Sequence, residues 1–384
     1  MSSPAPDWKI TFADNTIGEP EIEAVTEVLR SRWLSAGPRT REFEREFAAA
    51  HGVEDAVAVN SGTAALHLAV LALGLGPGDE VIVPSLSFVA SAAVTALQGA
   101  TPVFADVRSE VDLTIDPADV CALITPRTRA IVGMHYGGYP ADLVALQEIA
   151  REHGVRLIED AAHAPAVFER EQALGTFGDI GCFSFFATKN VATGEGGMVL
   201  AKDPELLDRI RRTRAHSLTS STWRRLRTGQ SGYDVDGLGL NYRPTEIGSA
   251  LGRIQLAKLA EDRVLRSELV AAYRSRLDGV GVPFAEWTGD TAYHLMMVTL
   301  PEGVDREEVR GALTAAGIQT SVHYPPSHLF SYYRERYGSD RRSLPVTESL
   351  AERLLSLPLH ARMSTEDALL VADTLNTSLL SGRR

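Results

Sequence analysis

The 384-residue chain lacks several features that would assign it to a specialised class of protein. It contains only two cysteines, Cys121 and Cys182, far apart in the sequence, which argues against a disulfide framework and a cysteine zinc site. No stretch approaches the roughly 20 apolar residues that span a bilayer. Residues 1–9 also lack the apolar core of a signal peptide. We therefore expect a cytoplasmic protein with no membrane partner.

Positive charge is also scarce. The chain has 38 basic and 50 acidic side chains, a net charge of −12. This balance argues against nucleic acid as a partner, although a local basic pocket for a small anion remains compatible with it.

Four common active-site motifs are absent as well. There is no dinucleotide fingerprint after a strand, no Walker loop, no His-Glu-x-x-His pair and no Gly-x-Ser-x-Gly elbow. No metal site is predicted.

The sequence instead shows an alternation of apolar strand-like runs and helical segments, which predicts an α/β fold with a mainly parallel sheet sandwiched by helices. The expected strands are 81–84, 102–107, 130–135, 156–160, 181–186 and 198–201, and helices are expected at 64–73, 91–98 and 141–153. After about residue 243 the pattern predicts helices at 244–262, 264–277 and 305–316, strands at 293–300 and 318–324, and a final helix starting at Ser364.

This change of pattern predicts two domains, a large one over 1–250 and a small α+β domain over 251–384. Residues 216–240 fit neither and are expected to form a long functional loop.

The first candidate site is Asn60-Ser61-Gly62-Thr63-Ala64-Ala65-Leu66, a small-residue turn between a strand-like run and a helix. Free N–H groups at a helix start bind anions, so this turn is a candidate phosphate cradle. The alternative is a plain helix cap made by Ser61 or Thr63.

The second candidate is Glu159-Asp160-Ala161-Ala162-His163, directly after a buried strand. Ligands of open α/β sheets bind beyond the carboxyl ends of the strands, where a carboxylate can hold a ring nitrogen protonated. In the alternative reading, both acids cap the next helix and His163 packs in the core.

The third candidate is Lys189, which ends the run Phe183-Ser184-Phe185-Phe186-Ala187-Thr188 and precedes the glycine-rich turn 194–197. Apolar surroundings lower the pKa of a lysine and make its amine nucleophilic toward carbonyls. The alternative is a surface lysine. Together, an anion cradle, an acid after a strand and a lysine are what pyridoxal 5'-phosphate (PLP) requires.

At this point the chain resembles the DegT/StrS group of fold type I, PLP-dependent sugar aminotransferases. The matching stretches are 61–66, 78–84, 159–164, 183–190, 194–197 and 239–243. The resemblance implies an aspartate aminotransferase-like fold and a homodimer that shares its active sites.

The resemblance also implies roles for individual residues. Lys189 would carry the cofactor as a Schiff base and shuttle the proton, and Asp160 would pair with the pyridine nitrogen. The remaining cofactor contacts would be Gly62, Thr63 and Ser184 on the phosphate, Phe88 stacked on the ring, His163 near the phenolic oxygen, and Asn241 reaching the partner subunit's phosphate.

For the substrate, the resemblance points to Arg224, Arg225 and Arg227 of the long loop as contacts for a diphosphate, with a solvated basic face as the alternative. It also points to His323 and Tyr324 at the substrate entrance, where the alternative is a strand end stopped by Pro325-Pro326.

The implied reaction moves an amino group from glutamate or glutamine to a keto-sugar linked to a nucleoside diphosphate, in amino-sugar or antibiotic biosynthesis. Two alternatives remain: the same chemistry on a free keto-cyclitol or other cyclic ketone, and a PLP-binding regulator without turnover.

Overall fold

The computed structural model of the chain describes residues 7–220, 222–229, 231–337 and 342–381. Its helices are α1 Glu19–Ser31, α2 Pro38–Ala50, α3 Gly62–Ala72, α4 Ala90–Leu97, α5 Pro117–Leu123, α6 Leu143–His153, α7 Pro204–Thr213, α8 Thr222–Thr228, α9 Glu246–Arg276, α10 Arg306–Ala315, α11 Ser331–Tyr337, α12 Pro345–Arg353 and α13 Thr365–Ser381. Its strands are β1 Val57–Val59, β2 Glu80–Pro84, β3 Thr101–Ala105, β4 Thr128–Met134, β5 Arg156–Asp160, β6 Phe168–Glu169, β7 Gln172–Ala173, β8 Ile180–Ser184, β9 Gly197–Ala201, β10 Met296–Thr299 and β11 Leu354–Leu357.

The central sheet has seven strands in the order β1-β9-β8-β5-β4-β2-β3. The pairs from β3 to β8 are parallel, whereas β9 is antiparallel to both of its neighbours. The predicted, mostly parallel sheet is therefore confirmed. The sheet order also places the carboxyl ends of β5 and β8 side by side, which is where the second and third candidate motifs begin.

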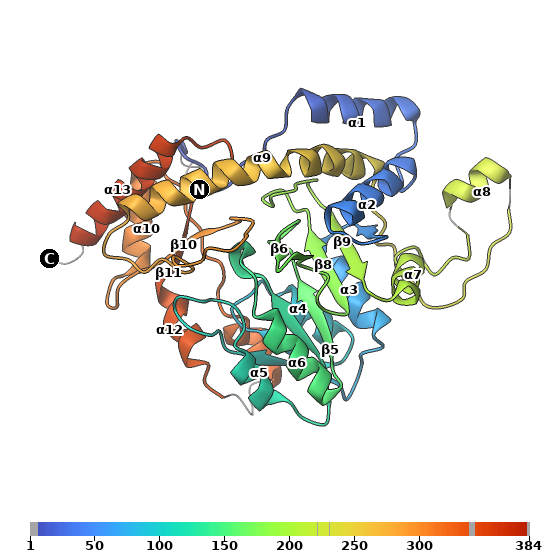
Figure 1. Cartoon of the computed structure of the whole chain (residues 1–384), viewed down its shortest axis with the longest axis horizontal. Helices are drawn as coiled ribbons and strands as arrows, with labels where there is room; N and C mark the ends of the chain where they lie inside the picture. The colour runs from blue at the N-terminus through green and yellow to red at the C-terminus, as the bar shows by residue number, and fades with distance from the viewer. Residues whose placement is uncertain (1–6, 221, 230, 338–341, 382–384) are drawn as a thin grey trace, which may run out of the picture.

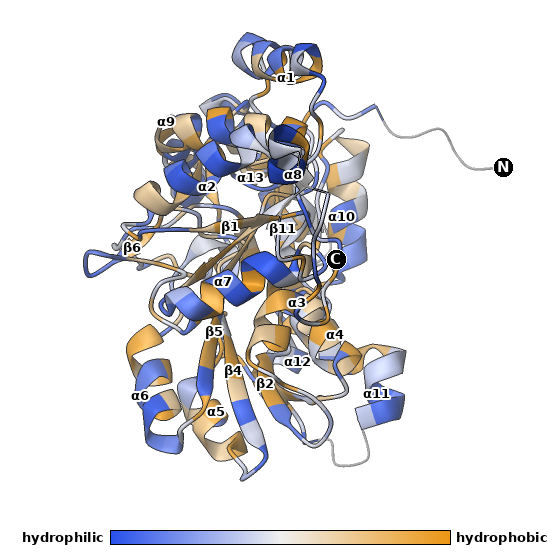
Figure 2. Cartoon of the chain, turned by 90° about the vertical axis from the view of Figure 1, so that its right-hand side faces the viewer, coloured by the Kyte–Doolittle hydropathy of each residue, from blue (hydrophilic) through white to orange (hydrophobic). Residues whose placement is uncertain are grey.

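Both faces of the sheet are covered because its strands are apolar on both sides. Alternate residues of β2 point to opposite faces: Val81 and Val83 pack with α3, α4 and α7, while Ile82 packs with α5 and α6. Figure 2 shows α5 and α6 on one side of β4 and β5, with α3 and α4 on the other.

A second core lies toward the C-terminus, where the antiparallel pair β10–β11 packs with α9, α10 and α13. Ile10 belongs to this core, and its backbone N–H donates to the carbonyl of Gly317. The N-terminal segment is thus attached to the C-terminal part of the chain.

Two features of the predicted elements were wrong, namely the break between two helices and one strand. The predicted helices 244–262 and 264–277 form one continuous 31-residue helix, α9, because no glycine or proline interrupts the chain between them. The predicted strand 318–324 forms only isolated bridges, from Ile318 to Ile10 and from Ser321 to Ser356. Pro325 and Pro326 follow it and have no N–H to continue a ladder.

Two further regions bear on the predicted organisation. Residue 250 lies inside α9, which contacts α1 and α2 as well as α13, so the chain crosses the predicted boundary as a helix; the division into two domains stays a prediction. The segment 216–240, expected as a loop, contains the short helix α8, which lies at the edge of the molecule in Figure 1 and contacts Trp33 through Trp223, with ring centroids 4.8 Å apart. No helix in the described part of the chain has the length and apolar character needed to cross a membrane.

Candidate active site

A cavity of about 430 Å³ brings together most of the predicted site residues. It lies where β5 and β8 end and α3 begins, and residues near β10 and β11 close it from the other side. The predicted residues in its wall are Gly62, Thr63, Phe88, Asp160, His163, Ser184, Lys189, His323 and Tyr324.

The N-terminus of α3 forms one wall of this cavity. Ser61 caps the helix by accepting a hydrogen bond from the N–H of Ala64 at 3.0 Å, as the simpler reading predicted. Gly62 lies so close to β8 that an added Cβ would be 2.7 Å from the Cβ of Ser184. Because the first N–H groups of a helix lack partners within it, the same turn also presents donors to the cavity. The cap and the cradle are therefore compatible.

Asp160 ends β5 with its side chain in the cavity and is only 4% exposed. Burial raises the pKa of this carboxyl, and the hydrogen bond from the N–H of Ala162 (3.1 Å) opposes that effect. Such a carboxyl suits a cationic ring nitrogen, whose charge would stabilise its ionised form.

Glu159 is fully buried outside the cavity wall and accepts hydrogen bonds from Gly175, Gly178 and His135 Nε2, the last at 3.1 Å. The reading of these acids as caps of a following helix was wrong, because the next element is β6.

Lys189 follows β8 and also faces the cavity, so its reading as an ordinary surface lysine was wrong. Burial lowers the pKa of its amine to about 8, and the nearby charge of Asp160 acts in the opposite direction. A substantial fraction of the amine is therefore neutral near pH 8, as a nucleophile toward a carbonyl must be.

His163 and Tyr324 lie in contact in the wall of the cavity. The N–H of Gly137 donates to His163 Nδ1 at 3.2 Å, so the ring proton lies on Nε2, which donates to the hydroxyl of Tyr324 at 2.9 Å. The Phe88 ring lies 6.0 Å from the Tyr324 ring. Beside them, His323 stacks on Phe12 with ring centroids 5.2 Å apart.

Sequence reasoning missed several residues of the wall, notably Phe12, Phe186, Glu195 and His294. Phe12 comes from an N-terminal segment without periodicity, and His294 lies within an apolar run that was read only as a strand. The one local feature that could have pointed to His294 as a site residue is the presence of a histidine within an apolar run.

Four predicted residues lie outside this cavity: Asn241, Arg224, Arg225 and Arg227. Asn241 is exposed and pairs with Ala215. Arg224 and Arg225 belong to α8, where Arg225 donates to the carbonyl of Ser220 at 2.6 Å and stacks over Tyr233. The chain by itself does not bring these residues to Lys189, so their roles stay predictions.

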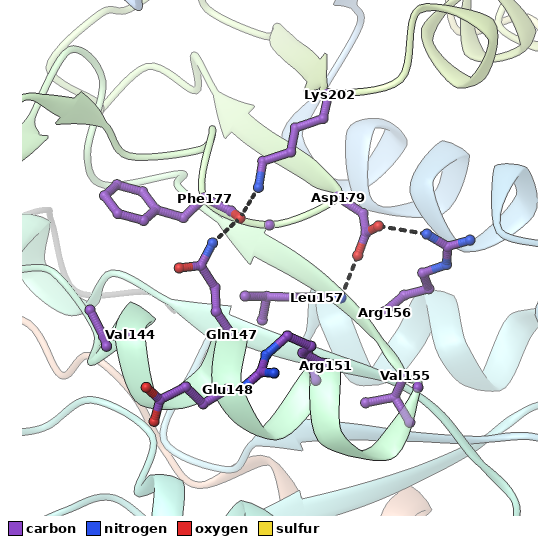
Figure 3. Close-up of a pocket in the computed structure, with 13 residues that line it drawn as sticks. Val144, Gln147, Glu148, Arg151, Val155, Arg156, Leu157, Phe177, Asp179 and Lys202 are labelled. Carbon is purple, nitrogen blue, oxygen red and sulfur yellow. Dashed lines mark hydrogen bonds and ion pairs between the residues drawn. The ribbon is translucent and has the colours of Figure 1, made fainter.

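A second cavity, of about 740 Å³, lies beside α6 and the start of β5 (Figure 3). Its polar groups bind one another: Asp179 accepts from Arg156 at 2.7 Å, and Gln147 and Lys202 both donate to the carbonyl of Phe177. None of the predicted site residues lines it. The cavity that contains Lys189 is therefore the candidate active site.

The residues of this cavity fit PLP. The α3 N-terminus and Ser184 suit its phosphate, the buried Asp160 suits its ring nitrogen, and the exposed face of Phe88 suits its ring. Lys189 suits its aldehyde.

Comparisons with known proteins agree with this assignment. The sequence model of the DegT/DnrJ/EryC1/StrS aminotransferase family matches residues 15–376 of the chain. The chain is 42% identical over 359 residues to the spore coat polysaccharide biosynthesis protein SpsC of Bacillus subtilis (strain 168), covering 91% of this chain and 92% of SpsC.

Two crystal structures are also similar. Aminotransferase TlmJ from Streptoalloteichus hindustanus has a TM-score of 0.90 at 37% identity, covering 98% of this chain and 100% of TlmJ. DesI, described in the presence of its TDP-sugar product, has a TM-score of 0.87 at 34% identity, covering 98% of this chain and 94% of DesI.

The aminotransferases of this family bind PLP, and the fold seen here is PLP fold type I. The chain thus belongs to the DegT/DnrJ/EryC1/StrS aminotransferase family and is a PLP-dependent sugar aminotransferase.

Proposed function

We propose that the protein transfers an amino group from glutamate or glutamine to a keto-sugar linked to a nucleoside diphosphate. The observation that carries this proposal is the meeting of Lys189, Asp160 and the α3 N-terminus around one cavity. Two relatives support a nucleotide-linked sugar as the acceptor. The product of DesI is a TDP-sugar, and SpsC is a polysaccharide biosynthesis protein.

Bound PLP supplies the electron sink that makes a carbon–hydrogen bond beside nitrogen acidic. Within this chemistry, Lys189 Nζ accepts the proton from one carbon and returns it to another, as general base and then general acid. Asp160 keeps the ring nitrogen protonated. Gly62, Thr63 and Ser184 hold the phosphate, while Phe88 and His163 orient the ring.

The proposal includes a cytoplasmic homodimer. Asn241 contacts the partner subunit's phosphate, and Arg224 and Arg225 contact the diphosphate of the substrate. Apolar side chains near α8 support a partner for this segment, because Leu226 is 68% and Leu238 is 99% exposed in the single chain.

The position of the cofactor tests the first part of the proposal. The protein is loaded with PLP, reduced with borohydride, digested and analysed by mass spectrometry. We expect a pyridoxyl group on Lys189 in the wild type and none in Lys189→Ala, with turnover of the variant reduced at least about a hundredfold. A wild type that binds no PLP, or carries it on another lysine, would contradict the proposal.

A panel of acceptors tests the substrate class. Multiple turnovers with a TDP-linked keto-sugar and glutamate are expected, with kcat/KM well above that for a free keto-cyclitol. Arg225→Ala should lower kcat/KM for the TDP-linked acceptor about tenfold or more, because hydrogen bonds between charged groups are stronger than those between neutral groups. The same variant should leave the half-reaction with glutamate unchanged. Arg151→Ala, beside the second cavity, is the matched control. Preference for the cyclitol, or no turnover with any acceptor, would refute the proposed substrate.

A further inference from the structure

His294 connects two residues that flank Lys189 and has no assigned role so far. Its backbone is fixed on the glycine turn that follows β4: the N–H of His294 donates to the carbonyl of Gly137 at 2.9 Å, and Thr291 Oγ1 donates to the carbonyl of Gly138 at 2.9 Å. The packing at this junction is close, because a Cβ added to Gly138 would be 2.9 Å from the Cβ of Ala292.

The first residue that His294 holds is Asn190, which directly follows Lys189. Asn190 Nδ2 donates to the carbonyl of Ala292 at 2.7 Å, which turns its Oδ1 toward the imidazole. His294 Nδ1 therefore carries a proton and donates it to Asn190 Oδ1 at 2.8 Å. Both side chains are buried, so each polar group depends on the other.

The second residue is His163. The two imidazoles pack with ring centroids 4.3 Å apart and an angle of 41° between their planes. His163 is itself held by Gly137 and Tyr324 through its two ring nitrogens. His294 therefore contacts both Asn190, beside Lys189, and His163, whose imidazole lies in the cavity wall.

Burial keeps His294 neutral, and the surrounding groups act in the same direction. Burial lowers its pKa well below the ordinary value, and His163, Lys189, Arg266 and His323 each disfavour a further positive charge. Burial lowers the pKa of His163 in the same way. Although three histidines line this cavity, no group of metal-binding side chains was found in the part of the chain that the structure describes.

We propose that His294 is a positioning residue: by holding Asn190 and packing on His163, it fixes Lys189 against the phenolic side of PLP. The inference rests on the proposed role of Lys189. It predicts that the hydrogen bond to Asn190 matters more than the volume of the imidazole.

The test compares His294→Asn with His294→Leu. The asparagine amide replaces Nδ1–H as a donor, whereas leucine fills space without donating. In the PLP-loaded protein, we expect His294→Leu to shift the pH midpoint of the visible cofactor absorbance by about half a unit or more and to lower kcat about tenfold or more. His294→Asn should stay close to the wild type in both. Unchanged midpoint and rate in His294→Leu, or equal impairment of the two variants, would overturn the proposal.

Two controls separate positioning from general loss of structure. His51→Leu alters another buried histidine, which bonds to Phe47 and Ala166 away from the cavity; it should lower the melting temperature without shifting the absorbance midpoint. If His294→Leu does not fold, Asn190→Ala removes the same bond from the other side and should give the same shift. An Asn190→Ala protein with the wild-type midpoint would also refute the inference. A wild type without visible absorbance would instead refute the proposed function.

Discussion

The amine of Lys189 lies beside a buried carboxylate in a largely apolar cavity, and burial lowers its pKa to about 8. Because only the unprotonated amine attacks an aldehyde, covalent capture of PLP by the cofactor-free protein should accelerate as the pH rises through about 8 and then level off. An ordinary lysine would continue to gain reactivity up to about pH 10.4. To measure this profile, the reaction with PLP is stopped with borohydride after set times at a series of pH values, and the pyridoxyl group on Lys189 is quantified.

The effect of Asp160 supplies the check on this prediction. Its negative charge raises the pKa of Lys189, so Asp160→Asn should move the midpoint of capture to lower pH. A midpoint that stays in place, or a wild-type rate that still climbs beyond about pH 9, would show that the cavity does not control this amine.

Single residues differ in how far the sequence reveals them. Lys189 and Asp160 were predictable because Asp160 ends a buried strand, Lys189 follows another, and each belongs to a compact motif. Phe12 and His294 were not, because they reach the cavity through contacts between segments far apart in the chain, such as Phe12 on His323 and His294 on Asn190.

Among the elements, the strands of the central sheet were predictable because parallel strands are apolar on both faces. Helices α1 and α2 were missed. In α2 the apolar face consists mainly of Phe43 and Phe47, and its stability depends on packing against α9 and the sheet, which local sequence does not reveal.

The contact between α2 and α9 can be tested at Gly252. An added Cβ there would lie 2.5 Å from the Phe43 ring, so Gly252→Ala should destabilise the fold by about 1–3 kcal/mol despite the better helix propensity of alanine. Gly311 in α10 is the matched control, because it faces open space. Gly311→Ala should stabilise by up to about 1 kcal/mol. Denaturant unfolding of both variants measures the difference, and a stabilised Gly252→Ala would contradict this packing.

On the scale of the whole molecule, the chain is acidic, with a net charge of −12, yet its proposed cofactor and acceptor are anions. In the proposed dimer, the arginines of α8 supply positive charge to the partner's cavity. Neither the dimer nor this placement follows from the single chain, because Asn241 and α8 lie outside its own cavity.

Mixed subunits test the shared site. Lys189→Ala and Asn241→Ala homodimers should each be strongly impaired. A hybrid dimer of the two has one site that carries both changes and one that carries neither, so mixing under subunit exchange should restore activity. If hybrids form, as native mass spectrometry would show, but activity does not return, Asn241 does not act across the interface.

Helix α9 packs on α1 and α2 near one end of the molecule and on α13 near the other (Figure 1). At about 1.5 Å per residue, its 31 residues extend roughly 46 Å. Since neither core can lose this helix without exposing apolar surface, the two cores are expected to unfold cooperatively. Calorimetry of the cofactor-free protein should show one transition whose van't Hoff and calorimetric enthalpies agree. Two resolved transitions would contradict this expectation, because one core would then unfold while the other stays folded.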